Sequence, residues 1–306
     1  MASWSFVHAT DIHVGSPKSF RFQPAWNENW QTARRQIVDI HPDLLILSGD
    51  LTRDGSLHRY ELETVRADLD ALPFPCLVAP GNMDTGNKHT QVSGPLPNRD
   101  DVSLNVTSEQ IANFNAVFGP TQWTVEHKGV RFSGFCDVIA GSGLPEEQAL
   151  WDWLERQTEL APARRQVWIT HSPLFVEDPD EPSFDIKDPA HYLDWYFGVS
   201  QPARSRILDA FRATRTALHL CGHVHCRKRH RVGDTEFHIG PSTAFAQWAE
   251  RWPDGAPDLG FVRYDVTGDG IESTFVPLER VSNAKGYGPG GHVPPELRDY
   301  SIAWEK

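Results

Sequence analysis

Seven residues of the types that bind metal ions occur between positions 11 and 225, each at or just after the end of an apolar run. They are Asp11, His13, Asp50, Asn82, His171, His223 and His225. The segment 43–50, DLLILSGD, is typical, because a buried strand stops at a glycine and a carboxylate follows. Imidazole and carboxylate together are the usual ligands of zinc, iron and manganese, so the pattern predicts a metal site.

Five strands that end in this way would bring the seven side chains to one edge of a sheet, where open α/β sheets bind ligands. A single His or Asp after a strand is usually a turn residue, but that explanation does not account for all seven together. Gly49, Gly81 and Gly222 each precede a candidate ligand, at points where the backbone must turn sharply or approach a neighbour closely.

In order and spacing these motifs (DxH, GD, GN, a lone His, then GHxH) resemble the calcineurin-like metallophosphoesterases. The motifs cover residues 11–225, and the resemblance in architecture extends to about residue 278. It implies an α/β fold, a four-layer α/β/β/α sandwich of two mixed sheets flanked by helices. It also implies two metal ions, with the seven residues divided into two ligand sets: Asp11, His13 and His225 for the first metal, Asn82, His171 and His223 for the second, and Asp50 as the bridge between them.

Two cations about 3.5–4 Å apart can share a hydroxide, lower its pKa and neutralise phosphate oxygens during in-line attack. The sequence has no GxSxG and no Cys/His signature of a protein nucleophile. We therefore expect hydrolysis of a phosphoester by metal-bound hydroxide, with two transition-metal ions (manganese, iron or zinc) as cofactors. The expected catalytic residues are Asp50, Asn82, Asp84 and His171.

The family usually has the motif GNH followed by an acidic residue, and the His of that motif is held to contact the leaving group. In this sequence Met83 takes the place of that His. A thioether cannot donate a proton, and a general acid is typically worth about 10²–10⁴-fold in rate. Either the acid is missing, or Lys88, His89 or His58 replaces it. Asp84 keeps the acidic position.

Two segments narrow the substrate class. GDLTRDGSLHRYELE (49–63) and IGPSTAFAQ (239–247) are similar to segments of the cyclic-nucleotide and glycerophosphodiester phosphodiesterase branch. A phosphodiester is therefore the first expectation. A broad-specificity phosphomonoesterase is the alternative, and a non-catalytic binding module is less consistent with seven retained ligands.

The composition excludes several classes. The net charge of -12 argues against a nucleic-acid polymer as partner, and the basic run 227–231 fits the solvated face of a hairpin. No apolar run approaches the roughly 20 residues of a membrane span, and residues 1–15 lack the basic start of a signal peptide. The four cysteines read as reduced thiols, so we expect a cytoplasmic protein with a small phosphoester as substrate.

Apolar periodicity predicts helices over 25–40, 57–72, 146–160 and 202–213, alternating with strands, and hairpins from residue 120 onward. We expect one domain over 1–278 with long connections near 83–107 and 173–201. Both connections follow a candidate ligand and should lie over the metals, so Met83, His89, Trp195 and Tyr196 are the candidate substrate-binding residues. Residues 279–306 are expected to form an ordered tail or a contact between subunits of a homo-oligomer.

Overall fold

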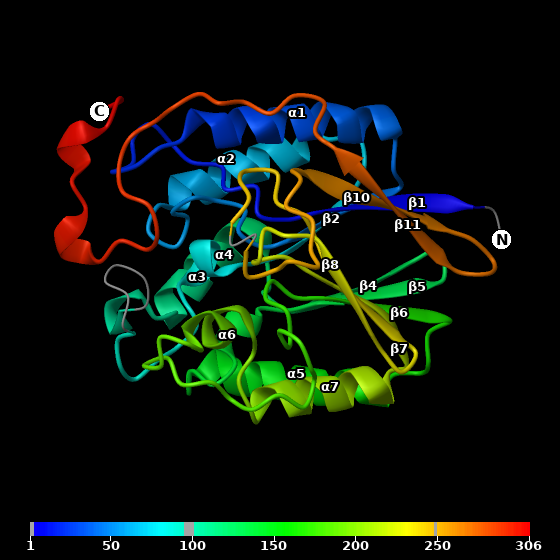
Figure 1. Ribbon diagram of the computed structural model, residues 1–306. Coiled ribbons are helices and arrows are strands. Elements are labelled where there is room, and N and C mark those ends of the chain that lie inside the picture. Colours follow the sequence, from blue (N-terminus) through cyan, green and yellow to red (C-terminus); the bar gives the residue numbers. More distant parts are fainter. Residues whose placement is uncertain (1–2, 95–100, 248–249) are drawn as a thin grey trace.

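The computed structural model describes residues 3–94, 101–247 and 250–306, and two stacked β-sheets form its centre (Figure 1). Within these residues the first sheet has the strand order β11-β10-β1-β2-β3. Its strands are β1 (Trp4–Ala9), β2 (Leu44–Ser48), β3 (Cys76–Ala79), β10 (Gly260–Val266) and β11 (Ile271–Pro277). β1, β2 and β3 run parallel, whereas β10 and β11 join as antiparallel strands.

The second sheet has the order β4-β5-β6-β7-β9-β8 in the described part of the chain. Its strands are β4 (Trp123–His127), β5 (Val130–Gly134), β6 (Arg165–Ile169), β7 (Thr216–Cys221), β8 (Lys228–Val232) and β9 (Thr235–Ile239). β5, β6, β7 and β9 are parallel, and the two edge strands pair antiparallel. Because the strands with parallel neighbours in each sheet end on the same side, their carboxyl ends form one edge.

Helices cover the outer face of each sheet (Figure 1). The two main helices on the first sheet are α1 (Pro24–Ile40) and α2 (Arg59–Asp70), and those on the second are α5 (Pro145–Glu159) and α7 (Ala203–Ala213). The shorter helices are α3 (Asn82–Thr85), α4 (Ser108–Phe118) and α6 (Tyr192–Phe197), with 3₁₀ turns at Val102–Leu104, Asp137–Ile139, Pro295–Leu297 and Tyr300–Ile302. The predicted four-layer α/β/β/α sandwich of two mixed sheets is therefore confirmed.

Three apolar clusters hold the layers together. Between the sheets, Phe6 stacks on Tyr264 with ring centroids 4.7 Å apart and meets Phe132 edge-on at 5.3 Å. Trp30 belongs to the cluster under α1 and α2, and Trp168 to the cluster under α5 and α7. Full burial of such a side chain contributes about 1.5–3 kcal/mol to the free energy of folding. These clusters therefore hold the ends of the strands in fixed positions.

The four predicted helices lie within two residues of the observed ones, but the sequence reading missed α4. This helix begins with a capping box in which Thr107 and Gln110 bond each other's backbone N–H. Only Ile111 and Phe114 are buried among its residues, and so narrow an apolar stripe does not stand out from a polar loop. The predicted connection 83–107 contains α3, and part of it, residues 95–100, lies outside the described residues.

The C-terminal segment 279–306 leaves β11, crosses over α1 and reaches the side of the molecule where the parallel strands end (Figure 1). There Tyr287 exchanges backbone hydrogen bonds of 2.9 and 3.0 Å with Phe22. The Tyr287 hydroxyl also donates to the carbonyls of Pro17 and Ser19. The tail is thus ordered against its own chain.

None of the described helices combines the length and the apolar character that crossing a bilayer requires. Cys76, Cys136, Cys221 and Cys226 are all free thiols.

Two fully buried histidines make the stability of this fold depend on pH. His8 on β1 contacts the Ser48 hydroxyl at 2.7 Å, and His219 on β7 contacts the Thr170 hydroxyl at 2.7 Å. Burial lowers the pKa of each imidazole to about 3. Between that pH and the ordinary value of 6.5, the unfolded chain binds more protons than the folded one.

We therefore predict that stability is fully present above about pH 6.5 and is lost as pH falls, by up to about 1.4 kcal/mol per pH unit for each histidine. The His219→Gln variant should have a shallower pH dependence of its urea midpoint between pH 7.5 and 5, measured on chelator-treated protein. Equal slopes for the wild type and the variant would contradict this origin.

Candidate metal centre

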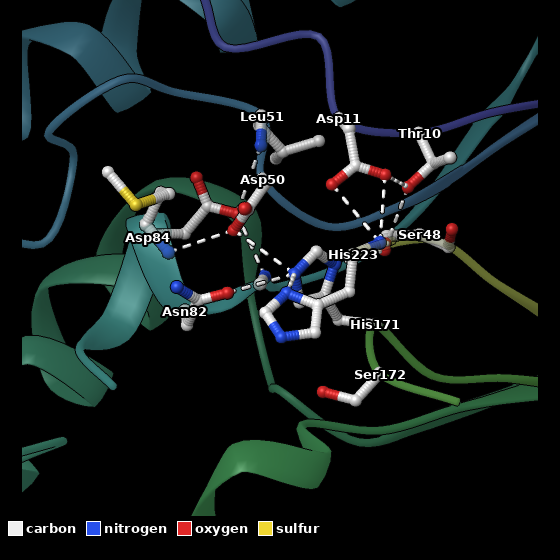
Figure 2. A network of polar contacts seen from close by, with 12 residues as sticks. Thr10, Asp11, Ser48, Asp50, Leu51, Asn82, Asp84, His171, Ser172 and His223 are labelled. Atoms are coloured by element: carbon white, nitrogen blue, oxygen red, sulfur yellow. Dashed lines mark hydrogen bonds and ion pairs between the residues drawn. The ribbon is translucent and has the colours of Figure 1, made fainter. Parts of the chain in front are cut away.

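The seven candidate ligands gather at the common edge formed by the carboxyl ends of β1, β2, β3, β6 and β7. Figure 2 labels Asp11, Asp50, Asn82, His171 and His223 among them. Each follows its strand directly or within four residues, because the polar residue comes just after the apolar run. All seven are at least 96% buried: Asp11, His13, Asp50, Asn82, His171, His223 and His225. The site lies where loops of the two sheets meet.

The ligand atoms form two groups that share one carboxylate. Donor atoms of one group lie within 4.8 Å of one another, and its members are Asp11, His13, Asp50 and His225. The second group, by the same measure, contains Asp50, His171 and His223. The amide oxygen of Asn82 lies 3.0 Å from His171 Nε2 (Figure 2). This division coincides with the one that the family resemblance implies.

The backbone is strained at this site. Among the described residues, eight that are not glycine have positive φ, and five of them are candidate ligands: Asp11, His13, Asp50, His223 and His225. The left-handed region costs an L-residue roughly 1–2 kcal/mol, and such strain persists only where the surroundings enforce it. A Cβ on Gly222 would lie 2.3 Å from Asp11 Oδ2, and a Cβ on Gly81 would lie 2.3 Å from Asp50 N. These glycines allow the loops to approach as closely as the cluster requires.

Backbone carbonyls orient three of the imidazoles. Each ring donates from one nitrogen to a carbonyl oxygen, and the pairs are His171 Nδ1 to Ser48 (2.9 Å), His225 Nδ1 to Phe245 (2.7 Å) and His223 Nε2 to Tyr196 (3.2 Å). A carbonyl can only accept, so the proton of each neutral ring sits on that nitrogen. The other nitrogen then presents a lone pair to the centre of the cluster, as a metal-binding histidine does.

The lone pairs of His171 and His223 face each other, because His171 Nε2 lies 3.1 Å from His223 Nδ1. His13 Nε2 lies at the same distance, 3.1 Å, from the His225 lone pair on Nε2. Two nitrogen lone pairs at this distance repel unless a cation lies between them. Without a metal a proton must fill the place, and Asp50 accordingly raises the pKa of His171 to about 10 against the effect of burial. The donor set therefore fits two cations, with Asp50 between them.

Asp84, predicted to be catalytic, lies beside Asp50 (Figure 2) and is fully buried. Its carboxylate accepts from the backbone N–H groups of Leu51 (3.1 Å), Thr52 (3.0 Å) and Gly81 (2.9 Å). It thereby joins the loop after β2, which carries Asp50, to the segment after β3, which carries Asn82. Burial and the nearby Asp50 raise the pKa of Asp84 to about 6. These contacts indicate a positioning role.

Sequence reasoning missed a matching carboxylate, Asp137. It follows β5 and accepts from the backbone N–H groups of His171 (2.6 Å) and Ser172 (3.1 Å). Asp137 therefore fixes the start of the loop that carries His171. The available signal was the same as for the ligands, an acidic residue after the apolar strand 130–136.

A cavity of about 420 Å³ opens over the cluster. Of the four candidate substrate-binding residues, Met83 and Tyr196 line it. Trp195 is buried beside Lys88, whose ammonium lies 4.7 Å from the ring centroid, and neither Trp195 nor His89 is among the described wall residues. The predicted loop 173–201 therefore reaches the cavity through Tyr196.

Several wall residues were not anticipated: Trp26, Arg53, Phe245, Gln247 and His292. Arg53 was available in the GDLTRDG segment, as the only cation there. Its guanidinium lies 5.0 Å from the Trp26 ring centroid. Burial and the neighbouring Arg21 lower the pKa of Arg53 to about 9, against the opposite effect of nearby carboxylates. A guanidinium in the wall of the cavity suits an anion. Nothing in the sequence around His292 pointed to the cavity.

Comparison with known proteins identifies the family. Residues 5–227, more than half of the chain, match the model of the calcineurin-like phosphoesterases. The chain belongs to this family of hydrolases.

Two curated relatives are distant in sequence. A serine/threonine-protein phosphatase, CPPED1 of Danio rerio, is 23% identical over 247 residues, or 72% of this chain and 69% of that protein. A probable glycerophosphodiester phosphodiesterase, GpdQ of Arcobacter nitrofigilis, is 26% identical over 202 residues, which is 60% of this chain and little more than half, 57%, of that protein.

Solved structures share the fold. A dimetal phosphatase from Danio rerio superposes with a TM-score of 0.55 at 12% identity, covering 90% of this chain and 99% of that one. A purple acid phosphatase from yellow lupin gives 0.57 at 11% identity, with coverages of 94% and 53%. At these identities the likeness concerns the fold alone.

We predict that purified protein carries close to two transition-metal ions per chain and that Asp50→Asn loses much of this metal together with activity. The amide cannot neutralise two cations that face each other, so both groups of ligands should weaken. Metal content by mass spectrometry and phosphoesterase rates are the measurements. Asp70→Asn, a surface carboxylate on α2, is the matched control. Full activity and metal content in Asp50→Asn would refute a shared carboxylate.

Proposed function

We propose that this phosphoesterase hydrolyses a phosphodiester such as a cyclic nucleotide or a glycerophosphodiester, with Asp11, His13, Asp50, Asn82, His171, His223 and His225 as the ligands of two metal ions. The observation that carries the proposal is the cavity over the cluster, in which one cationic side chain faces apolar and aromatic walls. A phosphomonoester is the alternative substrate.

The metal ions, when bound, would supply the nucleophile and neutralise phosphate oxygens. The protein's own residues then have to hold the ester over them. Arg53 would contact a phosphate oxygen, since it is buried, cationic and in the cavity wall. Met83 donates its backbone N–H to Asp50 Oδ1 at 2.8 Å, so its side chain is held beside the shared carboxylate.

The charge of the walls favours a diester. A phosphodiester carries one negative charge, whereas a monoester carries about 1.5 to 2 at neutral pH. Apart from the candidate ligands and the neutral His292, Arg53 is the one basic side chain among the described wall residues. The metal ions would face either ester, so what the wall itself adds is one guanidinium, which matches the single charge of a diester.

The shape and polarity of the walls also leave room for a second organic substituent. Trp26 and Phe245 stack with centroids 4.6 Å apart and an interplanar angle of 22°, and Met83 adds an apolar surface. Burying an aromatic or aliphatic substituent there would contribute at about 25 cal/mol per Å² of apolar area. A monoester has only one substituent to place.

The two sequence relatives differ on this point, because one is called a protein phosphatase and the other a probable glycerophosphodiester phosphodiesterase. The test is a panel assay on manganese-loaded protein. It compares bis(p-nitrophenyl) phosphate, p-nitrophenyl phosphate, 3′,5′- and 2′,3′-cyclic nucleotides and glycerophosphodiesters. We expect kcat/KM to be higher for at least one diester than for the monoester. A preference for the monoester would support the alternative. Protein that purifies without stoichiometric metal and hydrolyses none of these esters would favour a binding module.

We further predict that Arg53→Ala raises KM for the preferred diester about 10-fold or more while the metal content stays unchanged, because a hydrogen-bonded charge contributes about 1.5–3 kcal/mol. Arg53→Lys should raise KM less, since lysine keeps the positive charge but lacks the planar guanidinium with its paired N–H donors. The exposed Arg66, changed to Ala, is the matched control. An unchanged KM in Arg53→Ala would exclude this arginine from substrate binding.

A further inference from the structure

The C-terminal tail contributes a histidine to the active-site cavity. His292 lies in the wall of the 420 Å³ cavity together with Met83, and the same two residues also line a small neighbouring cavity of about 30 Å³. Asn82, a candidate ligand, lines the small cavity too. His292 therefore lies on the same side of the site as Met83, whose side chain cannot donate a hydrogen bond.

Two arginines fix the segment that precedes His292. Arg21 forms a buried ion pair with Asp54 and donates to the carbonyl of Gly291. Arg53 donates to the same carbonyl at 3.3 Å. Val293, on the other side of His292, is 97% buried. The imidazole is thus held in place by its neighbours on both sides.

The ring has one hydrogen-bond partner among the described residues, the Tyr196 hydroxyl, which lies 2.9 Å from Nε2. Tyr196 also accepts from His223 through its carbonyl. Burial, together with Arg21 and Arg53, lowers the pKa of His292 well below its usual value, so the ring is neutral and carries one proton. If the Tyr196 O–H donates to Nε2, that proton lies on Nδ1.

We propose that His292 donates a hydrogen bond from Nδ1–H to the leaving-group oxygen of the ester, a contact that Met83 cannot make. The inference rests on the proposed function. When the P–O bond breaks, both electrons stay on the leaving oxygen, which then takes a proton from water. The hydrogen bond strengthens as negative charge develops on that oxygen, so it stabilises the transition state more than the bound ester.

The position of the proton can be measured without any turnover. In zinc-loaded protein labelled with ¹⁵N-histidine, the His292 signals are identified by their absence in His292→Ala. We expect Nδ1 to be protonated and Nε2 to be the acceptor, with Nε2 shifting in Tyr196→Phe. A proton on Nε2 would overturn the proposal, because Nδ1 would then be an acceptor.

The second measurement is the dependence of rate on the leaving group. With manganese-loaded His292→Ala, we expect alkyl diesters to slow by about 10²-fold and p-nitrophenyl diesters by less than about 10-fold, since one lost donor costs about 10²–10³ where charge is greatest. Metal content should stay unchanged. The surface histidine His41, changed to Ala, should leave both rates as they are.

Two further variants separate a donor from a merely structural contact. His292→Asn keeps an N–H near the position of Nδ1 but loses the Tyr196 contact, so it should retain more alkyl-ester activity than His292→Ala. Met83→His in the His292→Ala background should restore the alkyl esters selectively. If His292→Asn and His292→Ala lose the same alkyl-ester activity and Met83→His restores none of it, the role of His292 is structural and the proposal is wrong.

The alternative donors His58 and His89 are tested in the same series. His58 Nε2 lies 3.2 Å from the Tyr300 hydroxyl. Neither His58 nor His89 is among the described residues that line the cavity. A selective loss of alkyl esters in His58→Gln or His89→Gln, without one in His292→Ala, would overturn the proposal. A wild type that hydrolyses no ester would refute the proposed function itself, whereas an active enzyme with equal losses for all esters refutes only the role of His292.

Discussion

The whole site depends on imidazole lone pairs that face one another inside the protein. Two pairs of ring nitrogens lie 3.1 Å apart, with the Asp50 carboxylate between the groups, and burial removes the water that would otherwise separate them. Only positive charge at these points makes the arrangement stable. The strained backbone of the ligands, the carbonyls that orient the rings, and the carboxylates of Asp84 and Asp137 all serve to hold this arrangement.

The C-terminal tail completes the cavity wall through a second electrostatic interaction, that of a backbone carbonyl with two buried arginines. Arg21 and Arg53 are buried near the centre, where desolvation is costly, and the carbonyl of Gly291 accepts from both. A segment from the far end of the chain thereby solvates two arginines and closes one wall. Since the Arg53 guanidinium lies in its wall, the closed cavity is suited to an anion.

The alternating helices and strands and most of the site could be predicted because their signals are local. A buried strand followed by a polar residue is visible in a run such as 43–50, and the amphipathic stripes of α1 and α2 are equally plain. Asp137 carried the same signal but stood outside the recognised motifs. The apolar stripe of α4 was too narrow to be recognised as a helix. Trp195 was a candidate substrate-binding residue because its loop follows His171, but it is not among the described residues that line the cavity.

By itself, the sequence determined which residues end the strands, and hence the set of candidate ligands. Side-chain type and periodicity are enough for that, because parallel strands bring their carboxyl ends to one edge. The four layers were predicted only through the resemblance of the motifs to the family. Only the tertiary structure decided which nitrogen of His171, His223 and His225 faces the centre. It also decided that Asp84 joins the segments after β2 and β3, and that His292 and Met83 line the same cavity. These depend on contacts between segments distant in sequence, which no local pattern records.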